Sequence, residues 1–302
     1  MKKYQMIINK ITMKYRNLSE KMIIKDLLID EIIKELSMIF NVLINKGLKF
    51  DWLLVGGTSL SKSYKEIKRI SEDIDISILC ESKEYTKKVM KEILNYFLIL
   101  DNDKMLPFNI IDKDVISTNQ TFNFKNFKIH YKGYEFDIDF KSLINNNYYS
   151  PNHRKIMNVS HKILKLNQSE EIIIKVPDFK YIIAEKFLAY QKMKVKNTNN
   201  IRTWRHIFDI YSIFTEQLLE NNIKNWKEIN NIYNFIIDQY ERTQLEKDIK
   251  NNVIFANNFE ELKLNKDYLR LFLKTECFKK YSVKSIIDFY VNLKDILENL
   301  KK

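Results

Sequence analysis

The stretch "LLVGGTSLSKSYKEIKRISEDIDISIL", residues 53–79, decides the fold. It holds two of the chain's four glycines side by side, followed by Asp73 and Asp75 among apolar neighbours. Residues i and i+2 of a strand point to the same face, so both carboxylates share one face and the intervening isoleucines share the other. Adjacent carboxylates repel each other unless a cation or solvent compensates them. The stretch therefore predicts a strand, a glycine turn, a short helix and a second strand that carries a polar site.

The glycine turn is the first candidate for ligand binding. Gly56 and Gly57 follow the apolar run "FDWLLV" and precede a short helix expected over Thr58–Glu66. Glycine lets backbone N–H groups approach a ligand closely, and a helix N-terminus favours anions. The hydroxyls of Thr58 and Ser59 add donors. We expect this turn to hold phosphate groups, although a glycine pair after a strand is also common as a purely structural turn.

A second strand repeats the paired carboxylates. In "YEFDIDF", residues 134–140, Asp137 and Asp139 share one face. Oxygen ligands suit Mg²⁺, and two such ions can activate an attacking hydroxyl and neutralise a pyrophosphate leaving group. We expect Asp139 to join Asp73 and Asp75 as the third carboxylate, but the sequence does not fix the register and Asp137 stays open. The alternative is an exposed edge strand with solvated aspartates.

The rest of the chain separates into a mixed part and a helical part. Apolar spacing predicts a long helix over residues 19–45, a helix over 82–100 and β-structure over 109–143, with Lys132-Gly133 as a hairpin turn. "EIIIKVP" is a further candidate strand, and the pattern is helical from Asp178 onward. We expect an α+β domain with a mixed sheet and flanking helices over residues 1–175, and an all-α domain over residues 176–302.

Composition bounds the class of protein. The 302 residues carry a net charge of +12, which favours polyanionic partners, although a lysine-coated solvated surface explains the same balance. Cys80 and Cys277 form no disulfide framework and no CxxC pair, which indicates a reducing, cytoplasmic setting. The N-terminus lacks the apolar segment of a signal peptide, and no run approaches the ~18 apolar residues of a membrane span. The four histidines show no metal-ligand spacing.

The order of these features resembles the nucleotidyltransferase fold of the DNA polymerase beta superfamily. The string "GGTSLSKSYKEIKRISEDIDISI" is more specifically similar to the AbiEii/AbiGii toxin family, which carries Gly-Gly-Thr followed by Arg-x-Ser-x-Asp-x-Asp. The matching positions are Gly56, Gly57, Thr58, Arg69, Ser71, Asp73 and Asp75. The resemblance extends from about residue 50 to about residue 215, and nothing after about residue 220 matches.

Two helical motifs extend the resemblance. "VPDFKYIIAEKFLAYQ" matches a segment that carries a lysine, here Lys186, and "IRTWRHIFDIYSIF" matches an Arg-Asp-x-x-Asp-like motif through Arg205 and Asp209. His206 stands where the family usually has Asp, so the first acidic residue of that motif has no counterpart. Asp209 lies among apolar residues and needs a partner. It can orient Lys186, pair with Arg205 or bind the ribose of a nucleotide.

The resemblance implies three overlapping sets of site residues. The implied catalytic residues are Asp73, Asp75, Lys186 and Asp209. The implied nucleotide-binding residues are Gly56, Gly57, Thr58, Ser59, Arg69, Ser71 and Lys186. The implied metal ligands are Asp73, Asp75 and Asp139. Ser71 is in addition a candidate for modification.

The implied activity is that of a magnesium-dependent nucleotidyltransferase toxin of a bacterial toxin–antitoxin pair. It would transfer a nucleotide from a nucleoside triphosphate (NTP) to an acceptor and release pyrophosphate, with an RNA end, such as the acceptor end of tRNA, as the leading acceptor. The second domain would complete the nucleotide cleft, and an antitoxin protein would restrain the enzyme. The alternatives are nucleotidyl transfer to a small molecule such as an antibiotic, and a non-catalytic protein that binds nucleotides or nucleic acid.

Overall fold

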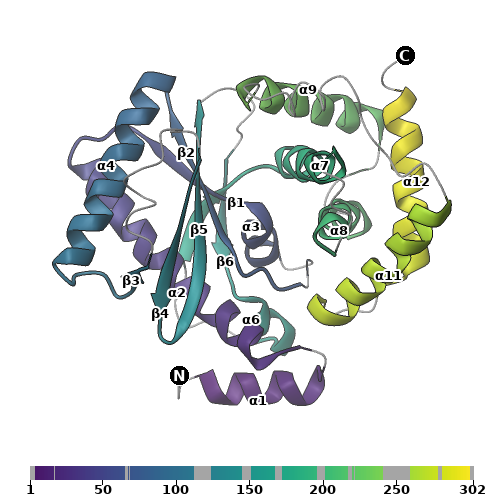
Figure 1. Ribbon diagram of the computed structural model, residues 1–302, viewed down its shortest axis with the longest axis horizontal. Helices are drawn as coiled ribbons and strands as arrows, with labels where there is room; N and C mark the ends of the chain where they lie inside the picture. Colours follow the sequence, from purple (N-terminus) through teal and green to yellow (C-terminus); the bar gives the residue numbers. More distant parts are fainter. Residues whose placement is uncertain are drawn as a thin grey trace. The chain divides into compact units, whose positions relative to one another are not determined.

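The computed structural model describes residues 4–16, 18–64, 67, 69–111, 124–144, 151–166, 172–195, 201–216, 220, 222–240, 259–277 and 281–299. The chain divides into two compact units. Residues 1–65 and 70–177 form the first, here called the sheet unit, and residues 66–69 and 178–302 form the second, the helical unit. Each is described by itself. The mixed α/β content and the mixed sheet that the sequence patterns predict are confirmed (Figure 1).

The sheet unit alternates helices and strands. Its helices are α1 (Gln5–Lys14), α2 (Glu20–Asn45), α3 (Gly56–Ser63), α4 (Lys83–Asn102) and α6 (Val159–Leu164). Its strands are β1 (Asp51–Val55), β2 (Ile74–Cys80), β3 (Asn109–Ile110), β4 (Phe124–Tyr131), β5 (Tyr134–Ile144), β6 (Asn152–Ile156) and β7 (Ile172–Val176).

The long helix α2 forms where the sequence predicts it. Ser19 is its N-cap, and its side chain accepts a hydrogen bond from the Met22 N–H at 3.2 Å. This bond satisfies one of the N–H groups that a helix start leaves without a partner. Gly47, just after the helix, has φ of +95°, the left-handed conformation common after a C-cap.

The main sheet has the order β1-β2-β5-β4-β3, in which β2 and β5 run parallel and the other neighbours run antiparallel. One face is apolar, and helices α2 and α4 cover it. Phe40 of α2 and Phe97 of α4 lie 6.0 and 6.2 Å, between ring centroids, from Phe140 on β5. Burial of aromatic rings dominates the stability of such a layer. The opposite face carries the polar side chains of β2, β4 and β5.

Several boundaries differ from the sequence prediction. Helix α3 begins at Gly56 rather than Thr58, so both glycines belong to its first turn. Asp73 is exposed and precedes β2, which begins at Ile74. Strand β6 and helix α6 occupy a segment, residues 152–164, for which the sequence patterns predict no helix or strand. The expected strand after Ile110 falls on residues 112–123, outside the described residues.

The hairpin turn between β4 and β5 is confirmed. Lys132 and Gly133 both have positive φ, +49° and +89°, and Tyr131 pairs with Tyr134. Two-residue hairpin loops favour positive φ at both positions because the resulting twist matches that of the strands.

The helical unit packs around aromatic side chains. It comprises α7 (Phe179–Val195), α8 (Ile201–Thr215), α9 (Ile223–Tyr240), α11 (Phe259–Glu276) and α12 (Val283–Asn299). Trp204 of α8 lies 5.4 Å from Tyr290 of α12, and Phe208 of α8 lies 5.0 Å from Phe272 of α11, both measured between ring centroids. No helix within the described ranges has the length and apolarity needed to span a membrane.

Candidate active site

Gly56 is required by its surroundings. It opens α3 directly after β1 with φ of +70°, and a Cβ at this position would lie 1.8 Å from Oδ2 of Asp75. Both facts exclude a side chain, because L-residues rarely adopt positive φ and atoms cannot approach to 1.8 Å. The first turn of α3 therefore lies directly against the carboxylate of Asp75.

The hydroxyls of the turn are used inside the fold. Thr58 donates a hydrogen bond to the backbone carbonyl of Asp73, and Ser59 donates one to the carbonyl of Gly56 at 3.3 Å. Both residues are fully buried. The backbone N–H groups of the first turn of α3, including that of Gly57, have no partner within the helix itself. These N–H groups, rather than the hydroxyls, are the donors that α3 offers to an anion.

The carboxylates of two strands lie in one register. Asp75 on β2 pairs with Asp139 on β5, while Asp137 lies beyond the start of β2. The structure therefore places Asp139, the residue that the sequence analysis preferred over Asp137, beside Asp75. Burial, together with the negative charges of Asp75 and Asp73, raises the pKa of Asp139 to about 6, against the opposing hydrogen bond from Asn126. The charge of Lys141 also lowers this pKa, but it does not outweigh burial and the two aspartates.

Asn126 is a site residue that the sequence interpretation missed. It lies opposite Asp139 on β4 and donates a hydrogen bond from its side chain to Oδ1 of that carboxylate. The signal was present in the sequence, because a two-residue hairpin at Lys132-Gly133 fixes which residues of β4 and β5 face each other. An asparagine opposite a buried aspartate then follows by counting.

The carboxylates fit a divalent cation by their chemistry. Asp73, Asp75 and Asp139 offer only oxygen ligands, which suit Mg²⁺. Burial and, to a smaller extent, the charges of Asp75 and Asp73 raise the pKa of Asp139. Among the described residues, however, no three acidic, histidine or cysteine side chains converge on one metal position. Binding of Mg²⁺ by Asp73, Asp75 and Asp139 therefore stays a prediction.

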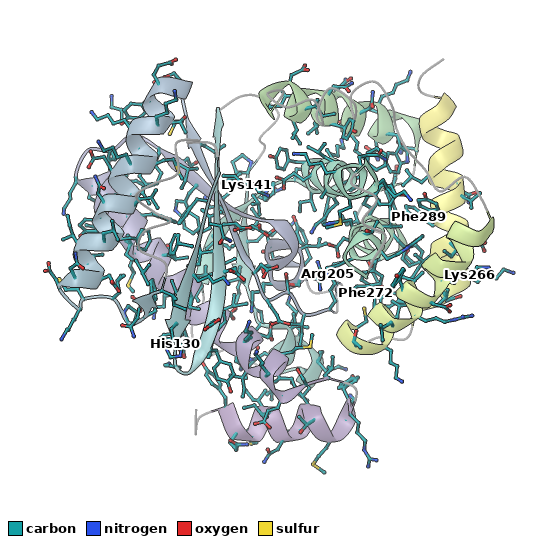
Figure 2. The ribbon with its side chains drawn as sticks, in the orientation of Figure 1. His130, Lys141, Arg205, Lys266, Phe272 and Phe289 are labelled. Atoms are coloured by element: carbon teal, nitrogen blue, oxygen red, sulfur yellow. The ribbon has the colours of Figure 1, made fainter. Side chains whose placement is uncertain are left out.

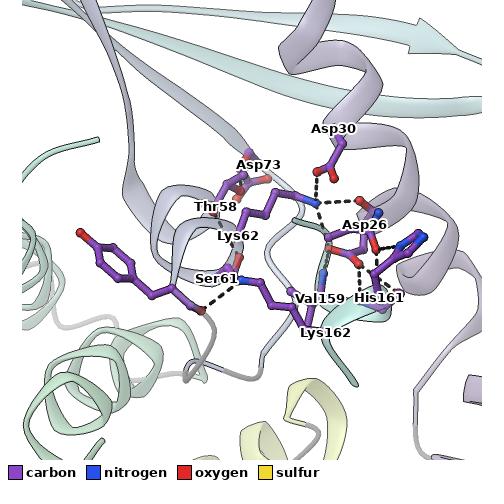
Figure 3. Close-up of polar contacts among 12 residues, drawn as sticks. Asp26, Asp30, Thr58, Ser61, Lys62, Asp73, Val159, His161 and Lys162 are labelled. Carbon is purple, nitrogen blue, oxygen red and sulfur yellow. Dashed lines mark hydrogen bonds and ion pairs between the residues drawn. The ribbon is translucent and has the colours of Figure 1, made fainter. Parts of the chain in front are cut away.

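A buried ionic cluster connects the C-terminal end of α3 to α2 (Figure 3). The ammonium group of Lys62, near the end of α3, lies 3.1 Å from Oδ1 of Asp26 and 2.6 Å from Oδ1 of Asp30, and it also donates to the Asp26 carbonyl at 2.7 Å. All three side chains are almost completely buried. Although burial lowers the pKa of Lys62, the two carboxylates outweigh it and the pKa is raised. The charged form of Lys62 is thus favoured in the fold.

The same cluster joins α3 to two other helices. Asp26, on α2, accepts hydrogen bonds from the N–H groups of Val159 and Ser160 at the start of α6, at 3.2 and 2.9 Å. Lys162 of α6 donates to the backbone carbonyl of Ser61 in α3. These bonds position the helix that carries the glycine turn. The sequence signal for them was Asp26 and Asp30, four residues apart on the otherwise apolar buried face of α2.

The helical unit contains a second charged cluster, centred on Asp209. Its carboxylate accepts hydrogen bonds from Nε and Nη2 of Arg69 at 2.5 and 2.7 Å, and it lies 3.0 Å from the ammonium group of Lys186. Asp209 is fully buried, Arg69 is 1% exposed and Lys186 is 7% exposed. Burial alone would raise the pKa of Asp209, but the two cations outweigh it and hold the pKa well below its usual range.

The partners of Asp209 answer a question that the sequence left open. Of the three alternatives, the structure supports the contact with Lys186, and it adds Arg69, which the sequence interpretation assigned to phosphate. His206, at the position where the family usually has Asp, lies near Lys186, Arg205 and Arg69. Burial and the charges of these cations lower its pKa to about 3, so the imidazole is neutral. Arg205, on α8, is labelled in Figure 2.

The predicted site residues thus fall into two groups. In the sheet unit, the glycine turn and the carboxylates come together; these residues are Gly56, Gly57, Thr58, Ser59, Asp73, Asp75 and Asp139. Ser71 belongs to the same unit and is 7% exposed. In the helical unit, Arg69, Lys186 and Asp209 form one cluster. The action of both groups on one nucleotide stays a prediction.

Comparison with known proteins identifies the family. Residues 39–275 match the family described as nucleotidyl transferase AbiEii toxin, type IV toxin–antitoxin system. The chain belongs to this family. It is a nucleotidyltransferase of the toxin–antitoxin type. None of the curated proteins is a significant match in sequence.

The solved structures that match this chain include two nucleotidyltransferase-type proteins and a uridylyl transferase. The toxin MenT4 from Mycobacterium tuberculosis shares 11% identity, with 89% of each chain covered and a TM-score of 0.48. A nucleotidyltransferase-like antigen from Paracoccidioides brasiliensis shares 16% identity over 75% of this chain and 97% of its own, with a TM-score of 0.37. Terminal uridylyl transferase 4 from Trypanosoma brucei shares 10% identity over 88% and 72%, with a TM-score of 0.31.

Proposed function

We propose that this enzyme transfers a nucleotide from an NTP to the end of an RNA, with the acceptor end of tRNA as the leading candidate. The acceptor hydroxyl forms a bond to the α-phosphorus, the bond between the α-phosphorus and the bridging oxygen breaks, and pyrophosphate leaves. The acceptor loses its proton in the same reaction. An antitoxin protein, implied by the family, restrains this activity.

The observation that carries the proposal is the carboxylate set beside the α3 turn, where the pKa of Asp139 stays raised in spite of Asn126 and Lys141. Asp73, Asp75 and Asp139 would hold Mg²⁺, which would supply positive charge beside the NTP phosphates and the attacking oxygen. The raised pKa of Asp139 supports this role, because a bound cation would favour the charged form that burial and the neighbouring aspartates disfavour. The backbone N–H groups of Gly56 and Gly57 contribute donors for a phosphate at the start of α3.

The helical unit contributes a fixed positive charge. Lys186 has its ammonium group held by Asp209, which is itself held by Arg69. An ammonium group is a compact charge suited to a triphosphate. We assign Asp209 and Arg69 to positioning Lys186, and Lys186 to the phosphates. Burial in the ionic pair removes Arg69 from the exposed surface, so it acts through Asp209 rather than by touching the substrate.

A labelling experiment tests the proposal. The protein is incubated with each α-labelled NTP, Mg²⁺ and total tRNA, beside an Asp75→Ala variant and a control, Glu92→Ala, which removes an exposed carboxylate from α4. We expect labelled RNA with the wild type and with Glu92→Ala, and a loss of at least 100-fold with Asp75→Ala. Pyrophosphate release without labelled RNA would exclude the RNA acceptor and favour a small molecule. Failure of the intact protein to bind any NTP would overturn the whole proposal.

A further inference from the structure

Helix α3 is too short to hold its own position. It has only eight residues, Gly56–Ser63, and two of them are the glycines of its first turn. Isolated helices shorter than about 12 residues are marginal in water, and glycine is among the weakest helix formers. Contacts with the rest of the sheet unit must therefore fix the place of α3, and with it the turn that lies against Asp75.

The ammonium group of Lys62 fixes the C-terminal end of α3. It has three N–H donors, and three oxygen atoms surround it: the carbonyl and Oδ1 of Asp26, at 2.7 and 3.1 Å, and Oδ1 of Asp30, at 2.6 Å. Figure 3 shows the side chain of Lys62 extending from α3 to these two residues of α2. Because each donor has an acceptor, the ammonium group has one defined place, and the end of α3 is held at a set distance from α2.

Helix α6 holds α2 and α3 in the same arrangement. Asp26 accepts hydrogen bonds from the N–H and from the hydroxyl of Ser160, both at 2.9 Å. Lys162 donates to the carbonyl of Ser61 and to that of Tyr64, the latter at 3.0 Å. The last carbonyl groups of a helix lack partners within it, so Lys162 completes the C-terminal end of α3.

The opposite end of α3 is bonded to the segment that carries the aspartates. Thr58 lies one helical turn before Lys62, and its hydroxyl donates to the backbone carbonyl of Asp73. Thr58 and Lys62 are both buried, at 0% and 1% exposed. Four residues of α-helix span about 6 Å. A displacement of α3 at Lys62 is therefore transmitted over about 6 Å to Asp73, the residue before β2.

Stability alone does not explain an ionic cluster at this place. Replacement of buried ion pairs by apolar residues of similar volume is often neutral or stabilising. Apolar packing has no preferred direction, whereas the three acceptors around Lys62 specify one position for its ammonium group. Catalysis depends on such positions, because a displacement of about 1 Å can slow an enzyme about 100-fold.

We infer that Asp26, Asp30 and Lys62 are positioning residues for nucleotidyl transfer, which act through α3 and Thr58 on Asp73. All three are almost completely buried, so they act without touching a substrate. The inference rests on the proposed function only for the acceptor with which activity is measured. The placement of Asp73 by α3 does not depend on that acceptor.

Hydrogen exchange of the full-length protein, followed by mass spectrometry, tests this placement without any substrate. The variant Lys62→Met/Asp30→Leu replaces one buried ion pair by apolar residues and leaves Asp26 bonded to α6. The matched control, Lys132→Met/Glu31→Leu, removes an ion pair that joins α2 to the β4–β5 hairpin instead. We expect the amides of residues 56–59 and 73–75 to exchange at least tenfold faster in the first variant, and within about twofold of the wild type in the control.

Unchanged exchange of both segments in Lys62→Met/Asp30→Leu would overturn the inference. If this variant does not fold, Asp30→Asn takes its place, because it keeps Lys62 bonded to Asp26 and should still accelerate exchange of residues 73–75 about threefold. The other end of α3 is tested by Thr58→Val, which removes the hydroxyl that reaches Asp73, and by Thr58→Ser, which keeps it. We expect the first to lower kcat at least tenfold and the second to stay within about threefold of the wild type.

A double-mutant cycle separates positioning from stability. The rate constant kcat is measured with α-labelled NTP, Mg²⁺ and total tRNA, under conditions in which urea unfolding shows every variant to be folded. Lys62→Met/Asp30→Leu and Thr58→Val should each lower kcat at least tenfold. Because both act on Asp73 through α3, the combined variant should lose no more than about threefold beyond the larger single loss. Losses that multiply would show that Lys62 acts by another route and would contradict the inference.

The two measurements also distinguish this inference from the proposed function. Faster exchange of residues 73–75 in Lys62→Met/Asp30→Leu, with no labelling of tRNA by the wild type, would support the placement of Asp73 and overturn the RNA acceptor. Labelling of tRNA by this variant at the wild-type rate would support the proposed function and overturn the positioning role.

Discussion

The carboxylates of Asp139 in the sheet unit and Asp209 in the helical unit have pKa values shifted in opposite directions by their surroundings. Burial and two neighbouring aspartates raise the pKa of Asp139 to about 6, in spite of the Asn126 amide and the charge of Lys141. Asp209 faces a guanidinium and an ammonium group, and its pKa falls well below the usual range. The two cations outweigh burial at Asp209, whereas Lys141 does not outweigh burial and the neighbouring aspartates at Asp139. This difference is consistent with the proposal that the Asp139 cluster binds a further cation.

The two shifts have opposite consequences for stability against pH. The pKa of Asp209 lies below its ordinary value of 3.8, so its contribution to stability is present above about pH 4 and is lost as the pH falls further. The pKa of Asp139 lies above the same value, so the folded state loses stability as the pH rises from about 4 to about 6. The predictions below test this contrast, from the largest expected effect to the smallest.

The largest effect is expected from Asp209→Asn. The amide cannot neutralise Arg69 and Lys186, and breaking a buried pair typically costs about 3–5 kcal/mol. Urea unfolding followed by tryptophan fluorescence measures this loss in the free energy of unfolding. The control is Asp267→Asn, which breaks an exposed pair with Arg270 and should cost at most about 1 kcal/mol. Equal losses in the two variants would show that the buried cluster does not stabilise the helical unit.

The next effect concerns the contact between Gly56 and Asp75. Gly56→Ala should lower the free energy of unfolding by about 2 kcal/mol, because the methyl group is strained at positive φ and displaces the carboxylate of Asp75. The control is Gly47→Ala, which has φ of +95° but nothing within 4 Å of its added Cβ. Nucleotidyl transfer should be lost in the first variant and kept in the second. If both variants lose the same stability and both stay active, the close approach of Asp75 is unimportant.

The smallest effect, with the opposite sign, is expected from Asp139→Asn. Removing this charge should stabilise the metal-free protein at pH 8 by about 1–2 kcal/mol, a value reduced for the partial exposure of the group. At pH 5, where Asp139 is already largely protonated, the gain should shrink. Thermal unfolding in a chelator at both pH values measures it, and Mg²⁺ should stabilise the wild type more than the variant. Asp137→Asn is the control on the same strand and face, and an equal gain there would contradict the assignment to Asp139.

Local patterns in the sequence were sufficient for most elements of the sheet unit. The Ser19 cap, the period of α2 and the Lys132-Gly133 hairpin all depend on residues close in the chain, and the structure confirms each. The start of α3 was wrong by two residues, because helix propensity disfavours the glycines that the contact with Asp75 requires there. Strand β6 was missed because its partner β7 lies about twenty residues away along the chain.

The residues of the candidate site also fall into those that a local motif predicts and those that depend on a partner distant in the chain. The residues that the sequence nominated carry chemistry in a local motif, as in Gly-Gly-Thr and Asp-x-Asp. Asn126, Lys62 and Asp26 were not nominated, because each acts only through a partner from another element. The role of Arg69 also changed, because its partner Asp209 lies 140 positions away in the chain.

The sequence by itself determined which groups are available: a glycine pair at a helix start, alternating aspartates on two strands, and a lysine and an aspartate on later helices. These depend on spacing along the chain, which fixes the face of a strand or helix that each side chain occupies. The tertiary structure alone decided which groups are compensated. It set Asp139 opposite Asp75 and Asp209 against Arg69 and Lys186. Charge interactions depend on distance in space, and only the fold brings residues distant in the chain within a few ångströms.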